Sequence, residues 1–326
     1  MKRFKNILCV VNSDAESKVA LERAVSLAAS NQARLKFVEI IDKSSLDLKL
    51  IDYIYSSKNI QEEIIALRQE QLEKLVAPLK KNIEITTKVL VGIPFLEIIH
   101  EVLRNDHDLV IKTAENEDIL DRIFDSDDMH LLRKCPCPVW LVKPNSPNTY
   151  KQIVAAVDVD DFYPEEELNT RHLLNVQIIE MASLLALSEF SQLHVVDVWD
   201  AAGEMVINSV FHDTPIEKVD AYVEEVRRQN GDNLDALVYS VEKNIGEGVS
   251  DYLAPQIHLI KGNPSKEVPA FSNDINADLV VMGTVARTGI PGFIMGNTAE
   301  TILNRLNCSV LAVKPQGFQT PIILPD

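Results

Sequence analysis

The 326-residue chain lacks any hydrophobic run that approaches the ~20 residues needed to span a bilayer. Its first apolar run, Ile7 to Val11, is short and is followed by polar residues, which predicts a strand and not a signal peptide. Four cysteines are too few for a disulfide framework in a chain of this length. We therefore expect a cytoplasmic protein with no membrane span.

The sequence also lacks the two commonest nucleotide-binding signatures, the Walker A lysine motif and G-x-G-x-x-G. No spacing indicates a Ser-His-Asp or Cys-His arrangement, and we predict no catalytic residues. Cys135 and Cys137 form a C-x-C pair near His130, which could bind a metal ion or oxidise. Because a zinc site usually has a second ligand pair, which is absent from the sequence, we favour structural thiols and predict no metal site.

The formal net charge of −17 is divided unevenly between the two halves of the chain. Residues 1–148 hold 21 Lys and Arg against 23 Asp and Glu, whereas residues 149–326 hold 11 against 26. A surface this acidic repels a phosphate backbone, so we expect no nucleic-acid partner. Any anion that the second half binds must be held locally, by backbone amides and a few cations, of which Arg287 is the obvious candidate.

The strongest organisational feature is an internal repeat, in which four segments recur in the same order. The matching pairs are FKNILCVVNSD (4–14) and YKQIVAAVDVD (150–160), VGIPFLE (91–97) and KGNPSKE (261–267), DLVIKT (108–113) and DLVVMG (278–283), and CPVWLVKP (137–144) and CSVLAVKP (308–315). A period of this length indicates a duplicated domain and not a solenoid, whose repeats span ~20–50 residues. We predict domains at residues 1–146 and 147–326, joined by the linker-like segment NSPNT.

Short apolar runs alternate with amphipathic segments in each half, which is typical of strands separated by helices. We expect strands at residues 7–11, 35–40, 89–91, 109–111 and 139–142, and again at 153–157, 193–198, 257–260, 279–282 and 310–313. We expect helices at residues 13–30, 60–79, 95–103, 173–187, 216–241 and 298–306. Because most strands are apolar throughout, the sequence predicts an α/β fold of two tandem doubly wound domains, each with a five-stranded parallel sheet.

The second half contains a strand, a glycine-rich loop and a helix in succession, DLVVMGTVARTGIPGFIMGNT at residues 278–298. This order brings free backbone N–H groups and a helix N-terminus to a phosphate. The alternative interpretation is a glycine loop that only lets the strand turn tightly into its helix. In the first half, residues 113–128 have lost the glycines and carry seven acidic residues in sixteen positions, which would repel a triphosphate.

The spacing Gly283-x2-Ala286-x9-Gly296-Asn297 resembles the C-terminal signature of the universal stress protein family, G-x2-G-x9-G followed by Ser or Thr. The resemblance covers both halves and is greatest to the tandem, two-repeat members of the E type. In the nucleotide-binding members, an Asp after the first strand and a Val that ends the second strand hold the adenosine, and the glycine loop wraps the phosphates. Carried over, with Arg287 added as the cation, the expected site consists of Val157, Asp158, Val196, Met282, Gly283, Ala286, Arg287, Gly296, Asn297 and Thr298.

The resemblance implies ATP or a related adenine nucleotide as the ligand, with or without Mg²⁺, and a role in the cytoplasmic stress response. Two residues depart from the pattern. Ala286 replaces a glycine, whose missing Cβ permits φ > 0, and Asn297 replaces Ser or Thr, although Thr298 follows it. In the first half, Asn12 replaces the Asp. We predict that only the second half binds ATP in the family's manner, and that the first half is structural or binds a different ligand.

Three functions stay open on the sequence alone. The first is a regulatory nucleotide-binding protein that an unknown protein partner recognises. The second is a slow ATPase or a self-phosphorylating protein with Thr284, Thr288 or Thr298 as acceptor, although no base or paired-carboxylate metal site is evident. The third is a scaffold whose pockets are empty or hold an apolar small molecule, with residues 201–211 lining a cavity or an interface.

The same family resemblance implies an assembly, because the fifth strands of two subunits commonly pair in its members. We expect strands 139–142 and 310–313 of this chain to pair internally, so that each covers the other's edge. The two domains would then be related by a pseudo-twofold axis and form a pseudo-dimer within one chain, and a further homodimer is left open.

Overall fold

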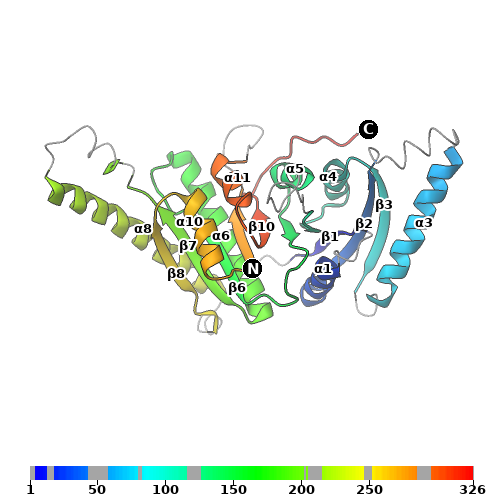
Figure 1. The fold of residues 1–326 in the computed structure, drawn as a ribbon, viewed down its shortest axis with the longest axis horizontal. Coiled ribbons are helices and arrows are strands. Elements are labelled where there is room, and N and C mark those ends of the chain that lie inside the picture. Colours follow the sequence, from blue (N-terminus) through cyan, green and yellow to red (C-terminus); the bar gives the residue numbers. More distant parts are fainter. Residues whose placement is uncertain are drawn as a thin grey trace. The chain divides into compact units, whose positions relative to one another are not determined.

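The structure is a computed structural model, which describes residues 4–12, 18–42, 58–79, 83–115, 126–201, 203–204, 215–245, 252–284 and 295–325. The chain divides into two compact units (Figure 1). The first-repeat unit contains residues 2–148 together with 308–314 and 318–326, and the second-repeat unit consists mainly of residues 149–307. Both have the mostly parallel α/β architecture that the sequence predicts. No helix in the described ranges is long and apolar enough to cross a membrane.

The first-repeat unit alternates strands and helices. Its elements are β1 (Asn6–Val10), α1 (Lys18–Asn31), β2 (Arg34–Asp42), α3 (Lys58–Val76), η2 (Ala77–Leu79), β3 (Ile85–Gly92), α4 (Pro94–Asn105), β4 (Leu109–Thr113), α5 (Ser126–Lys134), β5 (Val139–Val142) and β10 (Ser309–Val313). The strands run in the order β3-β2-β1-β4-β5-β10, and only β10 is antiparallel to its neighbour in this set. Every residue of β1, β4, β5 and β10 is buried, as expected for a sheet with helices on both faces.

Strand β10 comes from the end of the second repeat and covers the edge of β5. The register places Leu311 opposite Trp140 and Ala312 opposite Val139. The start of β10 is also held by a side chain, because the Oγ of Ser309 accepts a hydrogen bond from the backbone N–H of Lys143 at 3.1 Å. The predicted pairing of these two strands is confirmed, and it leaves no unpaired β5 edge on this side.

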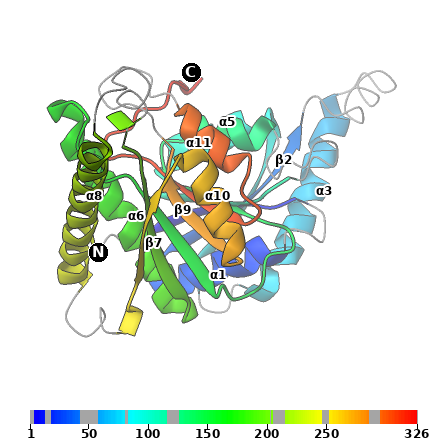
Figure 2. The same cartoon turned by 60° about the vertical axis from the view of Figure 1, so that its left-hand side comes forward.

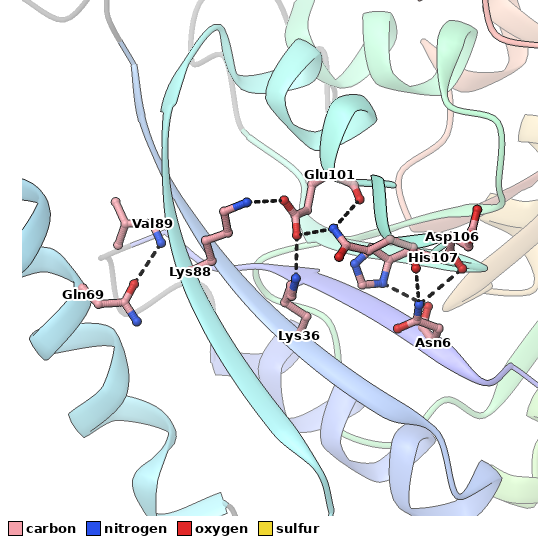
Figure 3. A network of polar contacts seen from close by, with 9 residues as sticks. Asn6, Lys36, Gln69, Lys88, Val89, Glu101, Asp106 and His107 are labelled. Atoms are coloured by element: carbon pink, nitrogen blue, oxygen red, sulfur yellow. Dashed lines mark hydrogen bonds and ion pairs between the residues drawn. The ribbon is translucent and has the colours of Figure 1, made fainter. Parts of the chain in front are cut away.

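A buried carboxylate fixes helix α4 on the sheet of this unit (Figure 3). Glu101 accepts hydrogen bonds from Lys36 on β2 at 2.7 Å and from Lys88 on β3 at 2.9 Å. Asn105, one turn along the helix, donates to the same carboxylate at 2.8 Å. Burial raises the pKa of Glu101, but the two lysines outweigh it, so the pKa lies below its usual value. Charge-assisted hydrogen bonds thus compensate the desolvation of a fully buried acid.

The second-repeat unit repeats this plan. Its elements are β6 (Gln152–Val157), α6 (Glu165–Glu189), β7 (Gln192–Trp199), α8 (Ile216–Ile245), β8 (Gln256–Lys261), α10 (Pro264–Asp274), β9 (Leu279–Gly283) and α11 (Asn297–Leu303). These strands run in the order β9-β6-β7-β8 and are all parallel. Helices α6 and α8 lie on one face of the sheet and α10 on the other (Figure 2).

An uncharged cluster takes the place of the Glu101 network in the second-repeat unit. By the alignment of the repeats, His194 on β7 and His258 on β8 replace the two lysines, and Phe271 on α10 replaces the glutamate. Nδ1 of His194 lies 3.0 Å from Nε2 of His258, and the Phe271 ring centroid is 4.5 Å from that of His258. Burial lowers the pKa of both histidines, so this cluster is packed in its neutral form.

Candidate functional site

The carboxyl end of the second-repeat sheet gathers five of the predicted site residues. Strand β6 ends at Val157, and Asp158 follows it. The register places Val196 on β7 and Met282 on β9 on either side of the penultimate residue of β6, and Gly283 ends β9. The chain forms β6, β7 and β8 as successive neighbours and then crosses to β9 on the other side of β6. In open α/β sheets, ligands bind at such a switch point, outside the carboxyl ends of the strands.

Asp158 is held in a fixed orientation by the loop and the helix that follow it. Its carboxylate accepts hydrogen bonds from the hydroxyl of Tyr163 at 2.9 Å and from the guanidinium of Arg171 at 3.1 Å. The guanidinium carbon lies 3.4 Å from the centroid of the Tyr163 ring, so the cation also stacks on the aromatic face. Asn175 holds the backbone, with its amide donating to the carbonyl of Asp158 at 2.6 Å. Burial raises the pKa of Asp158, and Tyr163 and Arg171 oppose that rise.

Asp197 is a second carboxylate at this edge, next to Val196 in the chain. It is 2% exposed, and Oδ1 accepts a hydrogen bond from the backbone N–H of Val159 at 3.2 Å. Among the described residues, Oδ2 has no hydrogen-bond partner. Burial raises the pKa of Asp197 to about 7, and the charges of Asp158 and Asp160 add to the effect. The site therefore contains a carboxyl group that exchanges its proton near neutral pH.

Gly283 and Gly296 lie at the two ends of the glycine loop, and their surroundings show why glycine stands there. A Cβ on Gly283 would lie 2.8 Å from Cδ2 of Leu174 on α6, so a larger residue here would force that side chain to shift. Gly296 precedes α11 with φ −68° and ψ 140°, a conformation open to any residue, and its N–H donates to the carbonyl of Thr284 at 3.2 Å. Asn297 and Thr298 are exposed at the start of α11. Neither described glycine therefore needs its conformational freedom.

Ala286, Arg287 and Thr288 lie outside the described residues, as do residues 205–211 of the segment that was expected to line a cavity. Of the candidate phosphate acceptors, Thr284 is fully buried, whereas Thr298 is exposed. In the described ranges, no group of three or more His, Cys, Asp or Glu side chains is placed to hold a metal ion.

The equivalent position of the first-repeat unit is filled by its own side chains. Lys112 on β4, the counterpart of Met282, donates to Asp128 at 2.9 Å and to Glu115 at 2.6 Å. The other oxygen of Asp128 accepts the backbone N–H of Glu115 at 3.0 Å. Burial lowers the pKa of Lys112, but the two carboxylates outweigh it and the pKa lies above its usual value. The carboxylate of Asp128 thus accepts the hydrogen bond of a backbone N–H group that follows β4.

Four residues of the second-repeat site were missed from the sequence: Tyr163, Arg171, Asn175 and Asp197. Asp197 carried a signal, because it is an acidic residue inside a mainly apolar predicted strand. Arg171 carried a weaker one, as one of only 11 Lys and Arg residues between 149 and 326. Tyr163 and Asn175 had no signal in their spacing, since they reach Asp158 only through the geometry of the loop and α6.

A sequence model of the universal stress protein family matches the chain twice, over residues 3–143 and 149–314. The chain belongs to the universal stress protein family. Universal stress protein E of Escherichia coli K12 is 31% identical over 338 residues, which cover 100% of this chain and 99% of that protein. Universal stress protein E of Salmonella typhi is 30% identical over 341 residues, with the same coverage. The homologue of Haemophilus influenzae is 29% identical and covers 96% of this chain.

Solved structures with two such repeats have the same fold. A universal stress protein of Pseudomonas aeruginosa UCBPP-PA14 superposes with a TM-score of 0.67 at 24% identity, covering 96% of this chain and 94% of that one. A universal stress protein of Archaeoglobus fulgidus superposes with a TM-score of 0.60 at 17% identity, covering 95% and 98%. The predicted family and fold class are therefore confirmed, including the tandem arrangement.

Proposed function

We propose that this universal stress protein acts in the cytoplasmic stress response, and that its second repeat binds ATP or a related adenine nucleotide as a regulatory ligand. The observation that carries the proposal is the convergence of Val157, Asp158, Val196, Met282 and Gly283 at the switch point of the second-repeat sheet. These are the residues that the family pattern assigns to the nucleotide. The switch point is where the topology favours a ligand independently of that pattern.

The charges at this edge support one orientation of the nucleotide. Asp158, Asp160 and Asp197 lie around the ends of β6 and β7, with Arg171 as the cation among them. Carboxylates accept hydrogen bonds from an adenine amine and from ribose hydroxyls, whereas they repel phosphate oxygens. The nucleoside would therefore lie over β6 and β7, and the phosphates would extend toward the loop that follows β9.

For the first repeat we propose a structural role. Asp128 already occupies the backbone donor after β4, and it is fully buried against Lys112. A nucleotide phosphate would have to displace this carboxylate and would meet the acidic segment 115–128. The loss of the Asp128 contacts and the repulsion by acidic residues therefore disfavour nucleotide binding to this repeat in the manner proposed for the second.

Isothermal titration calorimetry of the full chain tests the proposal with ATP and with adenosine. Asp158→Asn should weaken ATP binding about tenfold, equivalent to about 1.4 kcal/mol, because it removes the charged acceptor of the nucleoside. Asn12→Ala, at the matching position of the first repeat, is the control and should leave the affinity unchanged. Absence of heat in the wild type at millimolar ATP would refute the proposal. If the wild type released phosphate from ATP and Asp158→Asn abolished that release, the protein would instead be an ATPase.

A second candidate, a scaffold that binds no nucleotide, is favoured by one observation. Contact with Leu174 accounts for Gly283 without any ligand, so part of the loop pattern has a purely structural explanation. Under this alternative, the full chain would show no change in melting temperature with ATP, adenosine or AMP, whereas a nucleotide-binding repeat would melt at a higher temperature.

A further inference from the structure

Two cysteines lie side by side where helix α5 ends and strand β5 begins. Cys135 is fully buried and Cys137 is 8% exposed. Their Sγ atoms are 3.6 Å apart, within hydrogen-bond distance for sulfur. The backbone N–H of Cys135 donates to the carbonyl of Leu131 at 2.9 Å, which ties the first thiol to the last turn of α5. The pair is therefore held close together by the local backbone.

A buried lysine reaches this pair from the other end of the chain. Lys314 directly follows β10, and extending the β5–β10 register by two positions places it opposite Cys137. It is 4% exposed, and its ammonium group donates to the carbonyl of Leu132 in the last turn of α5. The C-terminal end of a helix favours a cation. The ammonium also lies 4.9 Å from the centroid of the Phe318 ring. The pairing of β5 with β10 thus places a positively charged group near the two thiols.

The three groups shift one another's protonation. Burial raises the pKa of Cys135, but hydrogen bonds from Cys137 and the charge of Lys314 outweigh it, and the pKa falls below its usual value. The hydrogen bond to Cys135 raises the pKa of Cys137, and burial and the charge of Asp108 add to that rise. Burial lowers the pKa of Lys314 to about 8, against the opposing effect of the thiols. The ammonium therefore favours the thiolate form of Cys135, whereas Cys137 holds its proton more tightly than an ordinary thiol.

We propose that Cys135 and Cys137 are a peroxide-reactive dithiol, in which Lys314 stabilises Cys135 as the attacking thiolate. The thiolate of Cys135 attacks one oxygen of hydrogen peroxide, the O–O bond breaks, and a sulfenic acid and hydroxide form. The hydroxide takes a proton from the ammonium of Lys314 and leaves as water. Cys137 then attacks the sulfenic acid, an S–S bond forms, and its thiol proton leaves with the hydroxyl as a second water. Two thiols are oxidised by two electrons and one peroxide is reduced.

The proton transfer also explains how the buried site tolerates oxidation. Once the thiolate is consumed, a buried ammonium would have lost its counter-ion, which is costly. Because Lys314 has given up its proton in the reaction, it is neutral and can still donate to the carbonyl of Leu132. The oxidised site therefore contains no unpaired charge, and β10 can stay on the sheet.

The repeat offers a natural control within the same chain. Cys308 is the counterpart of Cys137, and the same register places Lys143 opposite it. The residue two positions before Cys308 is Leu306, where the first repeat has Cys135. A single thiol beside a lysine cannot form the intramolecular disulfide. Cys9 is fully buried on β1, and burial raises its pKa, so it stays a thiol.

The test uses the full chain with Cys9→Ser and Cys308→Ser, so that the pair holds the only thiols. After exposure to hydrogen peroxide at pH 7, thiol titration in denaturant should show both thiols lost, and the intact mass should fall by two hydrogen atoms. Lys314→Met in this background should slow the loss several-fold at pH 7, because without the ammonium the pKa of Cys135 rises and its thiolate fraction falls. Lys143→Met should leave the rate unchanged.

A pH profile separates this role from a structural one. In the Lys314→Met variant the rate should rise toward the same plateau at a higher pH than in the parent, while circular dichroism shows that the variant is folded. The proposal is overturned if both thiols survive peroxide that oxidises the denatured chain, or if the product is only intermolecular. It is also overturned if Lys314→Met reacts at the parent rate across the pH range, as the control Lys143→Met should.

Discussion

Asp128→Ala removes the carboxylate on which a buried lysine depends. The side chain of Lys112 is 3% exposed and that of Asp128 is 0% exposed, and the two form a hydrogen-bonded ion pair of 2.9 Å. In the variant the ammonium would face a cavity in place of its buried partner. The backbone N–H of Glu115 would lose its acceptor as well. Removing one partner of a buried pair leaves an uncompensated charge and is strongly destabilising.

The size of the loss in the free energy of unfolding depends on the contacts that Lys112 keeps in the variant. Breaking a buried ion pair costs about 3–5 kcal/mol. Glu115 still contacts Lys112 at 2.6 Å, but its side chain is 42% exposed, so water screens it. We therefore expect Asp128→Ala to lower the free energy of unfolding by about 3 kcal/mol, at the lower end of that range.

The second repeat shows how the same position is built without charge. Met282 stands where the first repeat has Lys112, and Ala299 stands where it has Asp128. The double variant Lys112→Met/Asp128→Ala reproduces this apolar pair. Replacing a buried ion pair by apolar residues is often neutral or stabilising. We expect the double variant to recover to within about 1 kcal/mol of the parent, apart from the hydrogen bond to Glu115.

Tryptophan fluorescence can follow the first-repeat unit alone. The chain has two tryptophans, Trp140 on β5 and Trp199 at the end of β7. In a Trp199→Phe background, urea unfolding monitored at Trp140 reports the unit that contains Lys112. Equal destabilisation of the single and double variants would refute the reasoning, because the cost would then come from the cavity and not from the charge. A single-variant effect below about 1 kcal/mol would refute it as well.

Two further predictions concern the second-repeat unit. Asp197 keeps its proton up to about pH 7 in the folded chain, whereas the unfolded chain loses it near pH 4, so the folded state binds more protons between these values. Its stabilising contribution is present below about pH 4 and is lost as pH rises to about 7. Asp197→Asn should flatten this dependence, which amounts to on the order of 4 kcal/mol for about three pKa units, in urea unfolding monitored at Trp199. Gly283→Val should destabilise this unit by about 1–3 kcal/mol through overpacking against Leu174, with or without ATP. Leu174→Ala added to that variant should restore part of the stability in the same assay, and no restoration would contradict the contact.

Much of the fold could be predicted because its determinants are local. Ile7–Val11, Leu279–Met282 and the other apolar runs predict buried strands, and the recurrence of DLVIKT as DLVVMG indicates a duplication. Helix α5 was missed, because its first residues belong to the acidic segment 113–128, which was interpreted as a loop. Strand β10 was expected in the second half, and its pairing with β5 was expected as well. Its inclusion in the first-repeat unit depends on which contacts dominate, which sequence spacing does not reveal.

The candidate site was predicted in outline only. The carboxyl-edge rule brings Val157, Asp158 and Val196 together, because parallel strands present their carboxyl ends at one edge. The role of Asp158 is more constrained than the sequence indicated, since Arg171 and Tyr163 already contact its carboxylate. These contacts come from the loop after β6 and from α6, so their geometry follows from packing and not from residue spacing.

By itself, the sequence determined the family, the two α/β repeats and the loss of the glycine loop from the first of them. These follow from patterns within short windows and from their recurrence along the chain. Only the tertiary structure decided which ionisable groups are buried and what they contact: Asp197 beneath the loop after β6, Asp128 on Lys112, and Lys314 beside Cys135. The physical reason is that strand order and register join residues far apart in the chain, and burial then changes the energy of each charge.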